Sequence, residues 1–287
     1  MEDIADAAER LHERLVEIHA FDLALEFLAL GIDARRVYCQ FCLHAADIIP
    51  KSGAVGVIDR TIGGSVEYHP MKSHAPDIDI IYEDKTIVVV DKPAGAIVHP
   101  APGHEEGALT AKLVQLYPQM ARVGSAERPG VVHRLDIETS GVMVFAKTQE
   151  AYLDLRRQFE SHETVKKTYL AVVHGSPKPK SGMIDEPVGR ERLSAVTHWE
   201  TLGKHDGISL VEFKIDTGRM HQIRIHAASL GCPIVGDKTY GSAEKDRRLR
   251  RRPKRQLLHA VELSFLHPVT HKRVTFAAPP PEDIVYA

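Results

Sequence analysis

The sequence predicts a mixed α+β protein, with a helical segment at the amino terminus and a larger body built mainly of strands. Over residues 2–30, apolar side chains recur every three or four positions, which is the period of an amphipathic helix. From residue 78 onward, short apolar runs rich in Val and Ile alternate with Gly, Pro and Asp, a pattern typical of strands and turns. The length of 287 residues allows one large domain and a small appendage, so we expect an N-terminal segment over 1–77 and a main domain over 78–287.

Composition narrows the class of protein. Apolar residues make up 43% of the chain and charged residues 26%, the profile of a soluble globular protein with a sizeable core. No apolar run approaches the length of a membrane-spanning helix, and the first residues, Met-Glu-Asp-Ile-Ala-Asp, are too acidic for a signal peptide. We therefore expect a cytoplasmic monomer that does not associate with membranes.

The net charge of −2 conceals an uneven distribution of charge along the chain. The first 80 residues carry 14 acidic and 7 basic side chains, whereas the remaining chain carries 25 acidic and 30 basic ones. A basic main domain suits a polyanionic partner, which the total charge alone would not indicate.

The N-terminal segment is expected to hold a helix over 2–30 that stops at Gly31 and a second helix over 35–46. Cys39 and Cys42 have the spacing of a zinc or redox pair, but no second pair with matching spacing exists. Two buried cysteines on a helix are the simpler interpretation, so we predict no metal site.

In the main domain, apolar runs and breaker residues predict the order of elements. Helices are expected over 110–116, 151–160 and from 217 or 218 to 230. Strands are expected over 78–82, 86–90, 131–132, 142–146, 166–173, 184–187, 195–202, 208–215, 257–266 and 274–277. The first two strands, separated by Glu83-Asp84-Lys85, indicate a hairpin.

The densest group of polar residues lies between the strands expected at 131–132 and 142–146. It contains His133, Arg134 and Asp136, and it is closed by Thr139-Ser140-Gly141. A loop held by two strands can present a reactive side chain on a rigid scaffold. Taken by itself, however, the loop is better explained as a polar connection with a local pair between Arg134 and Asp136.

A second dense group precedes the last expected helix, at Thr217-Gly218-Arg219-Met220-His221-Gln222-Ile223-Arg224. Asp216-Thr217-Gly218 breaks the preceding strand, and Thr217 or Gly218 can cap a helix that stops before Gly231 and Pro233. This start would place Arg219, His221, Gln222 and Arg224 in about the first turn of the helix. Free N–H groups and arginines at a helix start attract anions. A third group, the basic run over 245–255 with Arg250, Arg251 and Arg252, is either a solvated loop or a set of phosphate contacts.

Three motifs, in this order, carry a resemblance to a known family. His-Arg-Leu-Asp-x-x-Thr-Ser-Gly at 133–141, Lys-x-Tyr-x-Ala at 167–171 and Thr-Gly-Arg-x-His-Gln-Ile-Arg at 217–224 resemble the signatures of the RluA-type RNA pseudouridine synthases. The resemblance covers about residues 78–283. It implies a mixed, largely antiparallel sheet with flanking helices and a central catalytic cleft, preceded by a small RNA-binding module that is degenerate here, because its basic residues are mostly missing.

The resemblance also implies an activity and the residues that perform it. The protein would isomerise uridines of structured RNA to pseudouridine, with Asp136 as the nucleophile and Arg224 as its cation. Tyr169 would pack on or hydrogen-bond the uracil, or help to remove the proton from its C5. RNA contacts would come from Arg134, which fills the space left by the flipped base, and from His133, Arg219, His221 and Gln222. Neither a cofactor nor a metal is implied, because the reaction involves no redox step or hydrolysis.

The RNA target is left open between two classes. The strings Val-His-Pro-Ala-Pro-Gly and Arg-Pro-Gly-Val-Val-His-Arg-Leu-Asp are most similar to members acting on large-subunit ribosomal RNA, while other members modify transfer RNA with nearly the same motifs. A ribosome-assembly protein whose catalysis is secondary is a second possibility. A metal hydrolase, which the 17 histidines could indicate, is a third and weak one, since no His-Glu-x-x-His pattern exists.

Overall fold

The computed structural model describes residues 78–100 and 107–285. The helices expected within 1–77, the Cys39 and Cys42 pair and the proposed domain boundary at residue 77 fall outside the described residues. They stay predictions.

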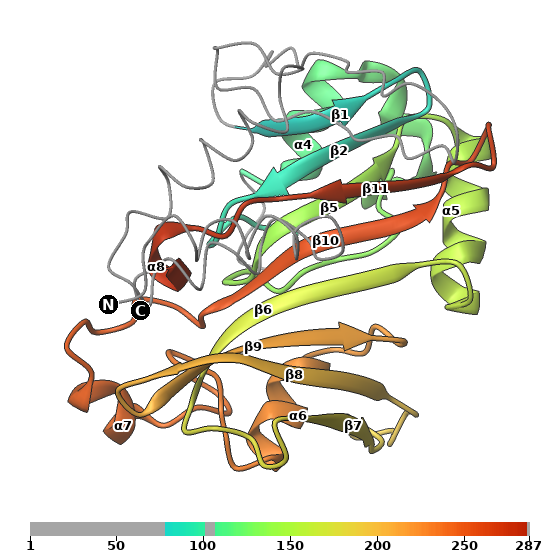
Figure 1. Cartoon of the computed structure of the whole chain (residues 1–287). Helices are drawn as coiled ribbons and strands as arrows, with labels where there is room; N and C mark the ends of the chain where they lie inside the picture. Colours follow the sequence, from blue (N-terminus) through green and yellow to red (C-terminus); the bar gives the residue numbers. More distant parts are fainter. Residues whose placement is uncertain (1–77, 101–106, 286–287) are drawn as a thin grey trace, which may run out of the picture. The chain divides into compact units, whose positions relative to one another are not determined.

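The described main domain is organised around one nine-stranded sheet (Figure 1). Eight strands follow the order β1 (Asp79–Glu83), β2 (Ile87–Lys92), β5 (Ser140–Ala146), β10 (Leu258–Leu266), β6 (Lys166–His174), β9 (Ile208–Ile215), β8 (Val196–His205), β7 (Ser181–Asp185), and β11 (Arg273–Ala277) pairs with β10. All neighbours are antiparallel except β5 and β10, which are parallel. A small separate hairpin joins β3 (Gly124–Ser125) and β4 (Arg128–Pro129).

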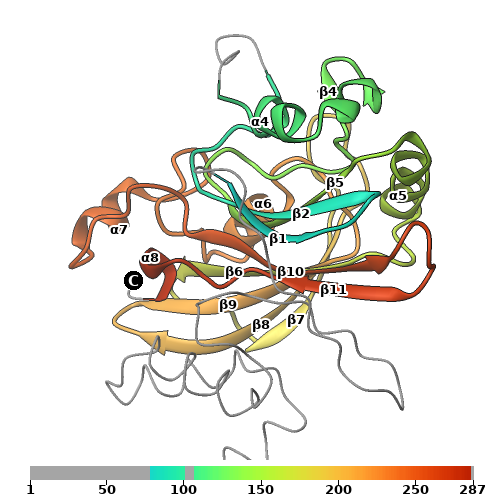
Figure 2. The same cartoon turned by 90° about the horizontal axis from the view of Figure 1, so that it is seen from above.

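Helices flank this sheet. They are α4 (Leu109–Leu116), the 3-10 helix η1 (Pro118–Arg122), α5 (Gln149–Ser161), α6 (Gln222–Ser229), α7 (Ala243–Arg248) and α8 (Glu282–Val285). The view from above shows α4, α5 and α6 on the same side of the sheet (Figure 2), where α5 packs against β5 and α6 against β8. The predicted α+β class with a largely antiparallel sheet is confirmed.

The core is centred on the middle strands. Every residue of β5 is buried, and in β2 only Asp91 is not fully so. Both strands read as nearly continuous apolar runs because each is covered on both faces, which is why short runs of Val and Ile identified them. No helix in the described ranges is both long and apolar enough to cross a membrane.

Most strands predicted in the main domain are confirmed, and β9 has the predicted bounds. The strand expected at 131–132 is wrong, because Val131 makes only an isolated bridge to Phe145. β10 pairs with β5 only at Ser140 and Gly141, so the edge of β5 opposite β2 is open at Phe145, but Val131 uses it for this single bridge and forms no strand. The strand expected at 184–187 also starts earlier, at Ser181.

The helix expected from Thr217 begins only at Gln222. His221 precedes it with a left-handed backbone, φ 59°, and its side chain makes no capping hydrogen bond. The Gln222 side-chain oxygen instead accepts hydrogen bonds from the Thr217 hydroxyl (2.7 Å) and from the Arg219 N–H (3.0 Å), which holds residues 217–221 as a compact loop. Arg219 and His221 therefore lie before the helix, not in its first turn.

Gly141, in β5, provides a test of the parallel contact at the centre of the sheet. It has φ 119°, and a Cβ atom there would lie 2.2 Å from the Ala260 carbonyl oxygen of β10. We expect Gly141→Ala to lower the free energy of unfolding by at least about 2 kcal/mol, because backbone atoms cannot yield cheaply. Gly203→Ala, in β8, meets open space and is the control. Equal urea midpoints for the two variants would contradict this account of the β5–β10 contact.

Candidate active site

Asp136 lies in the loop that enters β5, with its side chain 24% exposed to solvent. Its Oδ2 atom accepts hydrogen bonds from Arg224 Nη1 at 3.0 Å and from Gln256 Nε2 at 3.4 Å. Its Oδ1 atom is 3.9 Å from His221 Nε2. The carboxylate is thus fixed from one side and reachable from solvent, which is what a reacting group requires.

Arg224 connects this carboxylate to a second one. From the first turn of α6, Nε and Nη2 donate to the two oxygens of Asp237 at 2.7 and 2.9 Å, a bidentate contact. The side chain of Arg224 is 8% exposed and that of Asp237 is fully buried. We call Asp136, Arg224 and Asp237 the charge chain, because the arginine bridges the two carboxylates.

Backbone N–H groups help to keep Asp237, the buried end of the charge chain, ionised. Asp237 Oδ1 accepts hydrogen bonds from the N–H groups of Thr239 and Tyr240, at 2.8 and 2.9 Å. Burial raises the pKa of Asp237, but the hydrogen bonds from Arg224 and these N–H groups outweigh it and lower the pKa overall. For Arg224, burial acts to lower the pKa and the two carboxylates more than reverse it.

Tyr240 and His221 complete the surroundings of Arg224. The guanidinium carbon is 5.2 Å from the centre of the Tyr240 ring, within range of a cation–π contact. The His221 ring packs edge-on against the same ring, and its Nδ1 lies 3.2 Å from the Tyr240 hydroxyl. Burial lowers the pKa of His221, so the imidazole is neutral at neutral pH and can offer hydrogen bonds without adding charge.

Tyr169 projects from β6 into the core beside Asp136. Burial, and then the charge of Asp136, raise the pKa of the phenol well above its usual range. The group is therefore protonated at neutral pH and can donate a hydrogen bond or stack on a ring. The structure thus brings together the three residues predicted to be catalytic, Asp136, Tyr169 and Arg224, from three distant parts of the chain.

Lys92, at the end of β2, anchors the loop that carries Asp136. Its side chain is completely buried, and Nζ donates to the carbonyl oxygens of Pro93, Ile137 and Thr139 at 3.0, 2.9 and 2.8 Å. Three acceptors match the three N–H bonds of a protonated amine. Burial lowers the pKa of Lys92 to about 7, and the charge of Arg255 acts in the same direction.

Gln256 and Arg255, just before β10, hold the other side of the loop. Gln256 donates to the Thr139 hydroxyl at 2.7 Å as well as to Asp136. Arg255 pairs with both oxygens of Asp283 at 2.7 Å and donates to the Glu138 carbonyl at 3.1 Å. It belongs to the basic run by sequence, but it is buried and braces the scaffold.

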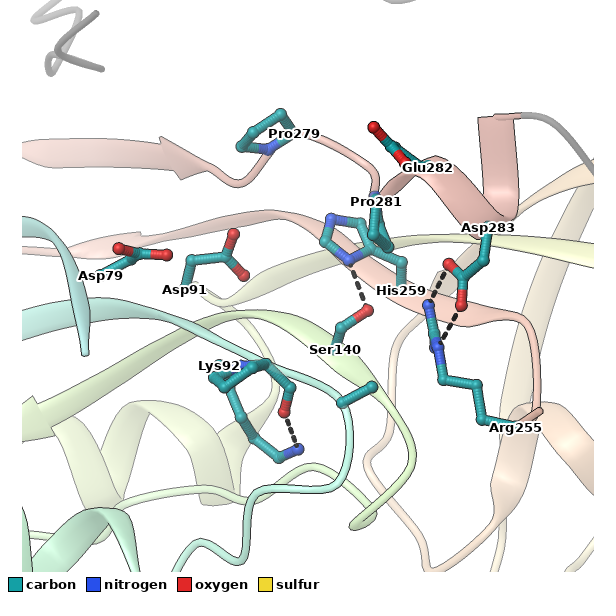
Figure 3. A pocket seen from close by; sticks show the side chains of 12 residues that line it. Asp79, Asp91, Lys92, Ser140, Arg255, His259, Pro279, Pro281, Glu282 and Asp283 are labelled. Carbon is teal, nitrogen blue, oxygen red and sulfur yellow. Dashed lines mark hydrogen bonds and ion pairs between the residues drawn. The ribbon is translucent and has the colours of Figure 1, made fainter. Parts of the chain in front are cut away.

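A pocket of about 430 Å³ lies beside this loop (Figure 3). Its lining includes Lys92, Ser140 and Arg255 together with the carboxylates of Asp79 and Asp91, but not Asp136, Tyr169 or Arg224. Burial and the neighbouring Asp79 raise the pKa of Asp91 to about 6. Within residues 78–100 and 107–285, no three His, Cys, Asp or Glu side chains are grouped so as to hold a metal ion.

The residues predicted to bind RNA fall into two sets. Arg134 and the exposed Arg250, Arg251 and Arg252 point into solvent, the last three in the segment after α7. Arg219 is half-buried, with Nε donating to the Ser194 carbonyl at 3.2 Å.

His133 and Gln222 make their observed contacts with the protein itself. His133 Nε2 accepts the Val144 N–H at 3.1 Å, and its ring stacks on Phe159. Gln222 is buried and donates to the Val196 carbonyl and the Thr197 hydroxyl, both at 2.9 Å. Their roles toward RNA stay predictions, as do those of the other residues in both sets.

The sequence did not reveal the roles of three residues of the site. These are Asp237, Gln256, and Lys92, which anchors the Asp136 loop. Asp237 follows Ile234-Val235-Gly236, a sequence that signals a turn and nothing more. Each of the three acts through a contact with a residue far away or across a loop, so no local pattern could have identified the role.

Similarity to known proteins identifies the family of this chain. A family model described as RNA pseudouridylate synthase matches residues 86–229. The chain is similar to an uncharacterized RNA pseudouridine synthase, slr1629, of Synechocystis sp., with 39% identity over 82% of this chain and 74% of the relative. It is also similar to ribosomal large subunit pseudouridine synthase D of Zymomonas mobilis, with 36% identity over 72% of this chain and 70% of the relative.

A solved structure agrees with these matches. Human RNA pseudouridylate synthase domain containing 4 superimposes with a TM-score of 0.59 at 28% identity, covering 72% of this chain and 90% of the human one.

Replacement of Lys92 tests its role as the anchor of the Asp136 loop. Lys92→Met keeps the length of the apolar stem but removes the Nζ donor from three carbonyl groups, of which Pro93 and Ile137 retain a backbone N–H donor and Thr139 loses the donor seen here. We expect the free energy of unfolding, measured in urea, to fall by at least about 2 kcal/mol, and the loop amides to exchange faster with deuterium. Lys85→Met, at an exposed turn, is the control. Unchanged exchange across 136–139 would contradict the anchoring role.

Proposed function

The chain belongs to the family of RNA pseudouridine synthases, and from that membership we propose that it isomerises specific uridines of large-subunit ribosomal RNA, with Asp136 as the nucleophile. The family makes it an isomerase that acts on RNA. The observation that carries the proposal is the charge chain, in which a carboxylate reachable from solvent is fixed by an arginine that a buried carboxylate holds in place.

The reaction defines what this site must supply. The bond between ribose C1′ and uracil N1 breaks, a bond between C1′ and C5 forms, and the proton leaves C5 while N1 gains one, so the product is an isomer. A carboxylate can form a covalent bond with C1′ or with the ring, and either attack needs it ionised and aimed. Arg224 supports both requirements, since it donates to Oδ2 and leaves Oδ1, among the described residues, without a cation at hydrogen-bonding distance.

Tyr169 is suited to holding the uracil. Because its pKa is raised, the phenol keeps its proton at neutral pH and cannot readily take one from C5. We therefore assign it to stacking on the ring or donating a hydrogen bond to it. Of the two roles implied by the family resemblance, this charge environment favours the binding one.

The uridine must leave its stack to reach Asp136, at a cost of about a few kcal/mol. Arg134, exposed and two residues before Asp136, is placed to fill the vacated space. Arg250, Arg251 and Arg252 are exposed and can contact phosphates. The similarity to an enzyme named for the large ribosomal subunit supports ribosomal over transfer RNA. That the protein is a cytoplasmic monomer stays a proposal from the sequence alone.

The decisive variant is Asp136→Asn, which keeps the shape of the side chain but removes the charge. We expect pseudouridine formation by the purified protein on unmodified total RNA to fall on the order of 10³-fold or more, while the affinity for RNA changes little. Asp206→Asn, at an exposed turn, is the control. Undiminished pseudouridine formation would contradict the catalytic assignment.

The same assays of pseudouridine formation also identify which class of RNA the protein modifies. Mapping pseudouridine in the ribosomal and transfer fractions after incubation with the wild-type protein should give new sites in large-subunit ribosomal RNA. Sites confined to transfer RNA would contradict the ribosomal assignment and leave the chemistry intact. RNA binding without any new pseudouridine would favour a ribosome-assembly role.

A further inference from the structure

Lys167 is a buried lysine on the same face of the sheet as Tyr169. The two residues are separated by one position on β6, so their side chains point to the same side, with Cα atoms about 7 Å apart. Lys167 is only 7% exposed. It lies between the loop that carries Thr217 and the side chain of His133, whose pKa its charge helps to lower.

Among the described residues no carboxylate pairs directly with the ammonium group of Lys167, although the charge of the nearby Asp216 acts to raise the pKa of the lysine. Nζ donates to the Thr217 carbonyl at 3.2 Å, and in the described part of the chain it forms no ion pair. The nearby Asp216 carboxylate is engaged by His198, 3.0 Å away. Burial lowers the pKa of Lys167 to about 8, so the protein surroundings alone do not stabilise the charge that the lysine carries at neutral pH.

Further donors converge on the same place. His162, at the end of α5, has a buried Nδ1 with no hydrogen-bond partner among the described residues. Burial lowers the pKa of this histidine, and the charges of Lys167 and Arg219 act in the same direction while that of Asp216 opposes them, which places the ring near all three residues. At Gly218 a Cβ atom would lie 3.6 Å from Lys167 Nζ, so Gly218 lies close to the ammonium group and places no side chain beside it.

We propose that Lys167, with Arg219 and His162, forms a subsite for a backbone phosphate of the RNA strand next to the target uridine. This inference rests on the proposed function, because it requires the uracil to lie against Tyr169. A phosphodiester supplies the missing negative charge and several oxygen acceptors. Its place beside Tyr169 suits a nucleotide whose base is held there while its backbone passes over Gly218.

The adjacent Lys166 provides a matched control. It is one position earlier on β6, so its side chain points to the opposite face of the sheet, and it is exposed. Lys166→Met and Lys167→Met therefore remove the same charge from the same strand, with only one of them facing the site. Lys167→Arg retains the charge, and His162→Asn removes the imidazole while tolerating the left-handed backbone.

The test measures binding of a synthetic RNA hairpin containing the uridine that the wild-type enzyme modifies, as a function of salt concentration. For Lys167→Met we expect a loss of affinity of about ten- to a hundredfold and a salt slope smaller by about 0.7 to 0.9. Lys167→Arg should restore most of both, and Lys166→Met should match the wild type. A purely structural role of Lys167 would slow catalysis but leave the slope unchanged, and that result would overturn the subsite.

A second measurement uses the unaltered protein, so it holds even if Lys167→Met folds poorly. Neutral methylphosphonates are placed singly at the phosphates flanking the target uridine. One of them should weaken binding to the wild type and cost nothing further with Lys167→Met. If no flanking methylphosphonate weakens binding while pseudouridine still forms, the subsite is contradicted alone. If the wild type forms no pseudouridine, the proposed function fails and the subsite with it.

Discussion

The bidentate contact between Arg224 and Asp237 is the interaction on which the site depends. Removing two charges from water is costly, and it is offset only when their geometry is good and their remaining polar atoms are satisfied. Here both oxygens of Asp237 are engaged, and Thr239 and Tyr240 supply further N–H donors. Arg224 is thereby fixed before any substrate arrives, and its remaining nitrogen can aim the Asp136 carboxylate.

The scaffold also fixes Asp136, the other end of the charge chain. The Asp136 loop is bound from below by Lys92 and from the side by Gln256 and Arg255, mostly through its carbonyl groups. These anchors come from the ends of β2 and β10, the two strands that flank β5. The sheet order thus explains why a short polar loop between residues distant in sequence can be rigid enough to position a reactive group.

Much of the fold and of the candidate site could be predicted from the sequence, and each prediction that failed has a physical reason. Val and Ile runs located β2 and β5, because strands covered on both faces leave a continuous apolar signal, whereas β9 was located by apolar residues that alternate with more exposed ones. The motifs led to Asp136, Tyr169 and Arg224. The predicted start of the helix was wrong because the Gln222 side chain accepts hydrogen bonds from the loop that precedes it. This arrangement matches no common capping motif. The supporting contacts of Asp237 and Lys92 are made in three dimensions, so the local pattern carried no sign of them.

The most direct test of the charge chain is a double-mutant cycle in single-turnover pseudouridine formation, with Arg224→Lys and Asp237→Asn alone and together. If Asp237 acts only by holding Arg224, removing its charge should slow the reaction of the wild type by on the order of 10²-fold. The same change should have little further effect once a lysine has replaced the bidentate arginine. Strictly additive losses in the double variant would contradict the charge chain as the basis of the site.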